Sequence, residues 1–414
     1  MSGSYQQLQD AKACADIIKF QQNGKPYPDF QAARVGPNQR LVEVFGIDNA
    51  FTNPDQKAKS AFSKRMGQLM MTATKIGKDN EESDWSDLRN RAIFYFDDYL
   101  LEIKKDTINL AELTQFITLE LSLFYLFSDA GKAKRSTNRF KDIIYIGHCI
   151  NQIWKDSKKA NTARPKWEDQ IELHDALRRV ITLELSMPGA FPEILDPNPL
   201  NVLLPAYETM WRVVIRGFLE IRYRKAADNL SWCKIMTDYL EKLESPISTQ
   251  NDAFHNATES GVRPIDVVKE TLRLYPPTRR VHREFDGQTC RADIEACQRS
   301  ELLGGNDPLV FRPERWQDIC AVERQRAFDK AKGAEKSLKR SEEELGYMPF
   351  AYWCAADHEE TKEFGMKMIA LLVAVLCEKL GNEWELENDE SLPKQGTPLG
   401  TDRGAYEDLK LKKL

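Results

Sequence analysis

The stretch Lys269–Arg283 has the sequence KETLRLYPPTRRVHR, and it marks the end of a helix. Glu270 and Arg273 are three residues apart, so on a helix they share one face and can form an ion pair. Pro276 and Pro277 follow them, and a proline lacks an amide hydrogen and clashes with the preceding turn, so the helix must end there. Because Glu–Arg pairs at this spacing are common on helix surfaces, the stretch becomes informative only together with its surroundings.

Three other motifs accompany this stretch in a fixed order. Upstream, Asn201–Trp211 has the sequence NVLLPAYETMW, in which an acid precedes an alcohol. Downstream lie FRPERW at Phe311–Trp316 and MPFAYWCAA at Met348–Ala356, followed by a long apolar segment, Glu363–Leu380. The ordered set is much more specific than any one of its members.

Apolar residues recur at three- and four-residue spacing along most of the chain, which is typical of helices. The segments with this spacing are 85–103, 110–127, 167–185, 200–225, 232–243, 265–274 and 363–380. Strand-like sequence is confined to 278–285 and the last twenty-five residues, where turn-forming residues cluster. We therefore predict a mainly α protein with a small β component.

Composition excludes several classes of protein. The 414 residues carry 59 basic and 64 acidic side chains, a net charge of -5, without a long basic stripe, so nucleic acid is not the expected partner. The longest apolar run, Met368–Cys377, is half of the about 20 residues that a transmembrane helix needs. The first residues lack a signal-peptide pattern, and the eight cysteines form no CxxC motif. We expect an intracellular, cytoplasmic protein with reduced thiols and no transmembrane segment.

The ordered motifs resemble those of the cytochrome P450 family, in particular its fungal members. Glu270 and Arg273 match the family's ExxR motif, and FRPERW matches its later arginine motif. The resemblance implies a P450-like fold in which Arg315 joins Glu270 and Arg273 in a buried charged triad that holds the cysteine segment. It also implies an N-terminal segment without a membrane anchor over 1–40 and a haem domain over 41–414. The resemblance further implies that the family's N-terminal part is shortened, and we expect either an exposed sheet edge or one covered by a helix over 5–20.

The segment Asn201–Trp211 resembles the family's oxygen-activating helix. Glu208 and Thr209 match its acid and its alcohol, and the resemblance implies that they are catalytic residues which relay protons into an apolar pocket. Pro205 stands where a small residue is usual. A proline within a helix removes one backbone hydrogen bond, so we expect the helix to be interrupted here.

Cys354 is the expected thiolate ligand of a haem iron, because Cys354-Ala-Ala resembles the family's Cys-Pro-(Gly/Ala). The loop before it is shorter than in the family, and strict counting places Asp357 or His358 at the ligand position. His358 is therefore the alternative axial ligand. A small buried core cysteine without haem is the third possibility.

Haem propionates require cations. The resemblance implies that His282 and Arg283, which follow the ExxR helix, are two of these propionate-binding residues. A Trp-x-x-x-Arg helix is typical of the other side of the haem, and the segment WSDLR, which ends at Arg89, has this spacing. The segment FSKR, which ends at Arg65, fits the order of helices equally well.

The resemblance implies a haem-thiolate monooxygenase that contains haem b and oxidises an apolar small molecule, in fungal secondary metabolism. Electrons would come from NADPH through a P450 reductase-type partner. Two alternatives remain open: a P450-like protein repurposed for a non-redox isomerisation or cyclisation, and a haem-free binding protein.

Overall fold

The structure is a computed structural model that describes residues 2–76, 82–127, 137–160, 163–181, 198–224, 228–319, 342–351, 361, 363–400, 404 and 406–414. Its helices are α1 Ser2–Ile18, α2 Phe30–Phe45, α3 Gln56–Ala73, α4 Ser86–Ile103, α5 Leu110–Leu126, α6 Thr137–Asp156, α7 Ile171–Ile181, α8 Leu200–Tyr207, α9 Met210–Arg222, α10 Asn229–Lys242, α11 Ile247–Ala253, α12 Pro264–Leu274, α13 Ile294–Gln298, α14 Glu301–Gly304 and α17 Phe364–Leu380. The strands are β1 Gln21–Gln22, β2 Lys25–Pro26, β3 Thr107–Asn109, β4 Arg280–Phe285, β5 Gln288–Asp293, β6 Trp384–Leu386 and β7 Lys410–Lys413. The helical segments and the strand near residue 280 that the sequence predicts are confirmed within the described residues.

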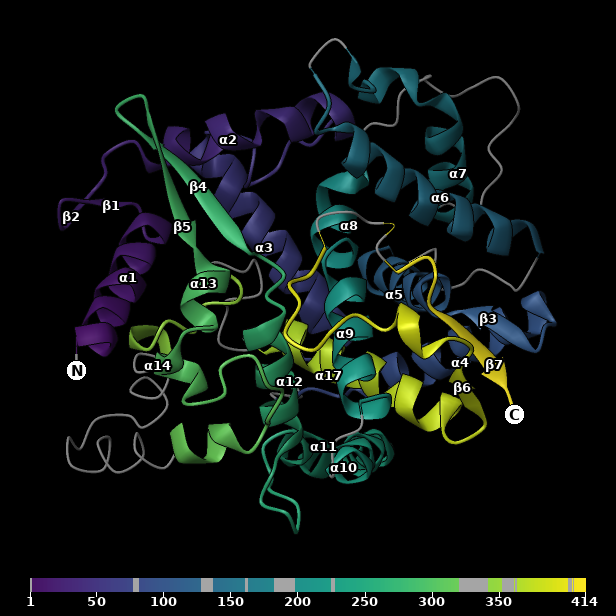
Figure 1. Ribbon diagram of the computed structural model, residues 1–414. Coiled ribbons are helices and arrows are strands. Elements are labelled where there is room, and N and C mark those ends of the chain that lie inside the picture. Colours follow the sequence, from purple (N-terminus) through teal and green to yellow (C-terminus); the bar gives the residue numbers. More distant parts are fainter. Residues whose placement is uncertain are drawn as a thin grey trace.

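Helix α17 lies in the middle of the molecule, where it contacts α4, α9, α10 and α12 (Figure 1). It is apolar all round, and every residue from Met368 to Cys377 is buried. Helix α5 is almost as deeply buried and packs between α4, α6, α8 and α9. A helix without a polar face must be surrounded by other helices, so these two helices form the centre of the core.

Helix α12 begins and ends where its sequence requires. Pro264 occupies the first helical position, where a missing amide hydrogen costs no hydrogen bond. The Asp266 carboxylate accepts the backbone N–H of Arg263 at 3.0 Å, which caps the helix. The helix ends at Leu274, two residues before Pro276. Glu270 and Arg273 are thereby placed near its C-terminal end.

The antiparallel strands β4 and β5 form a hairpin whose turn residues, Asp286 and Gly287, both have positive φ. Helix α1 packs on β5 and helix α2 on β4 (Figure 1). The covering helix that the sequence analysis expects near residues 5–20 is therefore present as α1. Helix α2 also runs through residue 40, where the sequence analysis places a domain boundary.

A second antiparallel sheet has three strands in the order β3-β7-β6. In it, β3, which directly precedes α5, pairs with the C-terminal strand β7. Asn109 ends β3 and caps α5, because its side-chain oxygen accepts the N–H of Glu112 at 2.8 Å. In the part of the chain that the structure describes, no helix combines the length and the apolar character that crossing a membrane demands.

Candidate functional site

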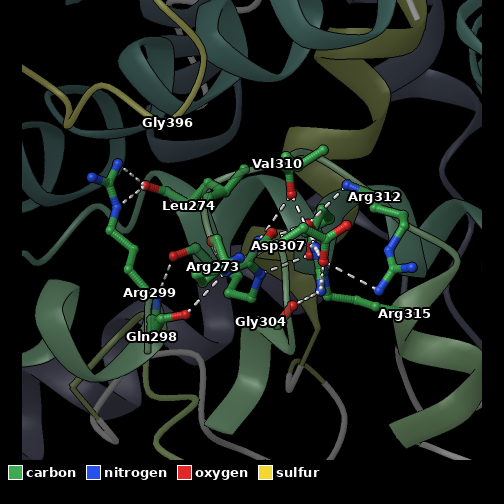
Figure 2. Close-up of polar contacts among 12 residues, drawn as sticks. Arg273, Leu274, Gln298, Arg299, Gly304, Asp307, Val310, Arg312, Arg315 and Gly396 are labelled. Carbon is green, nitrogen blue, oxygen red and sulfur yellow. Dashed lines mark hydrogen bonds and ion pairs between the residues drawn. The ribbon is translucent and has the colours of Figure 1, made fainter. Parts of the chain in front are cut away.

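A buried ionic cluster joins α12 to the segment before residue 319 (Figure 2). Glu270 is fully buried and accepts two hydrogen bonds from Arg273, at 2.9 and 2.8 Å. It also accepts three further hydrogen bonds: from Nε of Arg315 at 2.9 Å, from Nε1 of Trp316 at 3.1 Å and from the backbone N–H of Arg312 at 2.9 Å. The charged triad that the resemblance implies is confirmed.

The remaining donors of the two arginines bind backbone carbonyls. Arg273 donates to Pro308 at 2.7 Å and to Gln298 at 3.2 Å, and Arg315 donates to Val310 at 3.0 Å (Figure 2). A buried carboxylate is tolerated when its lone pairs are satisfied by charged donors, as they are here. The cluster therefore fixes the irregular segment 304–316 on α12.

Gln298 connects this cluster to the segment that leads toward Cys354. Its side-chain nitrogen donates to the carbonyls of Leu272 and Arg273, at 2.8 and 3.1 Å, and its oxygen accepts the N–H of Met348 at 2.8 Å. The four residues joined in this way are all buried. The end of α12 thus holds the chain six residues before Cys354, as the structural role of the triad requires.

Cys354 and its alternative ligand His358 lie outside the described residues. The chain is described on both sides of them. Before them, the Tyr347 ring packs on Trp316 with ring centroids 4.8 Å apart. After them, Phe364 begins α17 and packs edge-on against Tyr125 at 5.2 Å.

Glu208 and Thr209 lie between α8 and α9, two consecutive helices that run through the centre of the molecule (Figure 1). Both residues keep right-handed helical dihedral angles, so α9 continues the course of α8. Pro205 lies within α8, which continues through it to Tyr207, and the helix is interrupted at Glu208 and Thr209, three and four residues further on. Glu208 is buried with 3% exposure, and Thr209 is half-buried.

Of the two arginines expected from the Trp-x-x-x-Arg spacing, Arg65 lies on α3 with its side chain exposed. Arg89 lies on α4, and its guanidinium is bound elsewhere. Nε donates to the carbonyl of Leu240 at 2.8 Å, and Nη1 pairs with Glu244 at 2.5 Å. The structure therefore commits Arg89 to the end of α10, and we do not retain it as a propionate-binding residue.

His282 and Arg283 are neighbours on β4, where successive side chains point to opposite faces. The His282 ring is exposed, and partial burial together with Arg291 and Arg280 lowers its pKa. Arg283 turns to the other face, where its guanidinium stacks on Phe20 at 4.4 Å. The structure therefore separates the two side chains that the resemblance groups together.

Arg283 lies in a cluster of cations from three elements. Burial and the nearby charge of Arg34 lower the pKa of Arg283 to about 10. Arg34, on α2, is 3% exposed, and burial lowers its pKa to about 10 as well. Lys59, on α3, has a pKa lowered by burial and by Arg34. Nε of Arg283 is buried and has no hydrogen-bond partner among the described residues.

These cations fit an anionic group. Burial disfavours the charged forms of both Arg34 and Arg283, and the charge of Arg34 adds to this effect at Arg283, so a carboxylate beside Arg283 would be stabilised. The sequence analysis identified Arg283 but missed Arg34 and Lys59. No local motif marks them, because their role arises only when α2, α3 and β4 meet. Gln298 was missed for the same reason.

Solved cytochrome P450 structures resemble this chain in fold. A retinoic acid-bound cyanobacterial CYP120A1 has a TM-score of 0.54 and 14% sequence identity, and the match covers 97% of this chain and 87% of that chain. The heme domain of a cytochrome P450DA mutant has a TM-score of 0.50 and 13% identity, with 94% and 87% covered. No protein-family model matches the sequence, and no curated protein is similar to it. The chain therefore has the cytochrome P450 fold, and the predicted fold class is confirmed.

Proposed function

We propose that this protein is a haem-thiolate monooxygenase that oxidises an apolar small molecule. The observation that carries the proposal is the cation cluster of Arg34, Lys59 and Arg283 in a chain with the cytochrome P450 fold. The propionates of haem b, two carboxylates on one rigid planar cofactor, are groups that such a cluster of cations would bind. Arg283 would donate Nε, which has no partner among the described residues, to one of them.

Cys354 is the proposed axial ligand. When bound there, haem supplies an electron-rich iron that activates dioxygen. The protein's contribution to Cys354 is positional: Gln298 holds Met348 upstream, and α17 begins at Phe364 downstream. His358 is the alternative ligand, and it would give a less electron-rich iron.

Glu208 and Thr209 are the proposed proton-relay residues. A buried carboxyl next to a hydroxyl can hold a proton and pass it from water into an apolar site. Their position at the interruption between α8 and α9 supports this role, because a weakened helical hydrogen-bond pattern leaves backbone groups that can bind water.

Electrons would come from NADPH through a reductase-type partner, which the fold's chemistry requires and the motif resemblance implies. An apolar small molecule is the expected substrate class. A role in fungal secondary metabolism rests on the motif resemblance alone. Arg65 and His282 remain secondary candidates for contacts with the propionates.

The absorption spectrum of the reduced, carbon monoxide-treated protein tests the proposal. A strongly red-shifted thiolate band in the wild type, lost in Cys354→Ala and kept in Cys290→Ala, is the expected result. A histidine-type band that disappears in His358→Ala would move the ligand to His358. A preparation that binds no haem even after haemin is added would leave a haem-free binding protein or a non-redox catalyst, and the proposal would be withdrawn.

A further inference from the structure

Two cysteines from opposite ends of the chain meet beneath the N-terminal helix. Cys14 lies on α1 and is 4% exposed, and Cys297 lies on α13 and is half-buried. Both belong to a small apolar cluster, separate from the main core, that also contains Ile18, Val281 and Met348. Helices α1 and α13 pack together there, and the two sulfurs lie close enough to influence each other's ionisation.

This proximity makes the two sulfurs chemically unequal. Interaction with the Cys14 thiol lowers the pKa of Cys297, whereas interaction with Cys297, together with burial, raises the pKa of Cys14. Cys297 is also the more accessible of the two. A partly exposed thiol with a lowered pKa is the one that reacts first with an external disulfide.

The surroundings of this pair connect α1 to the segment that leads toward Cys354. Gly346 has a φ of 93° and lies between α1 and α13. A Cβ on it would be 3.3 Å from Cβ of Cys297, on α13, and 3.4 Å from Cβ of Ala11, on α1. Lys19, at the end of α1, forms an ion pair with Glu343. Helix α1 therefore covers residues 343–348 as well as the β4–β5 hairpin.

We propose that Cys14 and Cys297 form a reversible disulfide that fastens α1 onto α13 and onto the segment 343–348. The Cys297 thiolate attacks one sulfur of a small-molecule disulfide such as oxidised glutathione, which releases one thiol and leaves a mixed disulfide. Cys14 then loses its proton to solvent and attacks the Cys297 sulfur, which expels the second thiol. Two protein thiols are oxidised and one external disulfide is reduced to two thiols.

The proposal does not depend on haem. A second pair of neighbouring thiols, Cys233 and Cys377, joins α10 to α17 inside the main core, where the two helices already pack extensively. A disulfide between these two cysteines would therefore not restrain any element that the core leaves unrestrained. The Cys14–Cys297 pair instead joins the chain's first helix to the rest of the fold, so its oxidation has a structural consequence.

Peptide mapping of the folded, full-length protein tests the bond. After treatment with oxidised glutathione and alkylation of free thiols, trypsin should release the peptides 13–19 and 292–299 as one linked species, lighter by two hydrogen atoms than the two peptides together. Each of these peptides contains a single cysteine. Cys14→Ala should abolish the linked species, whereas Cys290→Ala should retain it.

Limited proteolysis supplies the second measurement. Oxidation should slow the removal of α1 from the wild type, dithiothreitol should reverse this effect, and Cys14→Ala should show no such protection. Cys14 and Cys297 that remain fully alkylatable, or that carry only glutathione without a cross-link, would overturn the proposal. A wild type that forms the linked peptide but releases α1 as fast as the reduced protein would overturn the fastening role.

Discussion

Nε of Arg315 donates a 2.9 Å hydrogen bond to Oε1 of Glu270, forty-five residues earlier in the chain. Arg273 occupies both oxygens of the same carboxylate from within its own helix. One fully buried acid therefore holds two buried guanidinium groups, which in turn bind the carbonyls of the segment 304–310. This arrangement ties the segment 304–316 to α12.

Glu270→Gln should reduce the free energy of unfolding by about 3–5 kcal/mol, because it leaves two buried arginines without their counter-charge. Urea unfolding followed by circular dichroism measures the loss. Glu241→Gln, which changes an exposed acid on α10, should change it by no more than about 0.5 kcal/mol. Equal effects of the two substitutions would show that the buried carboxylate is not important for stability.

Arg283→Met should weaken haem binding at least about tenfold, since one charge-assisted hydrogen bond is worth about 1.5–3 kcal/mol. In the haem-free protein, by contrast, the same substitution should not lower the free energy of unfolding. Removing a buried cation that Arg34 repels should leave the free energy of unfolding unchanged or raise it. Haemin titration and urea unfolding measure the two quantities, with Arg89→Met as a control that leaves haem affinity unchanged. Weaker haem binding that only accompanies lost stability would contradict the assignment.

Glu208→Gln and Thr209→Ala should leave haem binding intact but reduce product formed per NADPH, with hydrogen peroxide released in its place. The physical reason is that proton delivery fails while electron delivery continues. The measurement compares NADPH consumption, peroxide and product for any apolar compound that the wild type oxidises. Ser231→Ala, a change on the half-buried face of α10, is the matched control. Unchanged coupling in both site variants would remove these residues from the relay.

Asp84 should make stability depend on pH in the acidic range. Its burial acts to raise the pKa, but hydrogen bonds from Lys75 and Ser86 outweigh this effect and hold the pKa well below its usual range. A carboxylate with a lowered pKa in the folded state stabilises the fold above its unfolded pKa, about 3.9, and this contribution is lost as the pH falls toward the folded pKa. Asp84→Asn should therefore destabilise the protein at pH 7 and progressively less below about pH 4.

Urea unfolding of the wild type and Asp84→Asn between pH 7 and pH 3 checks this. Asp238→Asn is the control: it removes a surface carboxylate that pairs with Lys234 in solvent, and it should change the stability little at any pH in this range. A difference between wild type and Asp84→Asn that stays constant over the whole pH range would contradict the prediction.

Sequence reasoning was most successful where a local rule applies. The helix over 264–274 follows from its apolar spacing and from Pro276, and the pair of Glu270 and Arg273 follows from that helix. An interruption was expected at Pro205, but α8 continues through this residue and the break lies at Glu208 and Thr209. The spacing that pointed to Arg89 describes one face of a helix and does not say which helix this face meets; in the structure it meets the end of α10, where Nε of Arg89 donates to the carbonyl of Leu240.

The sequence by itself determined the helical architecture, the strand after α12 and the motifs of the buried triad, because residues within a few positions of each other interact through fixed helix and strand geometry. Only the tertiary structure decided that Arg34, Lys59 and Arg283 lie close together and that Cys14 and Cys297 share one apolar cluster. These residues are far apart in the chain, and whether they meet depends on how α1, α2, α3 and β4 pack, which no local spacing encodes.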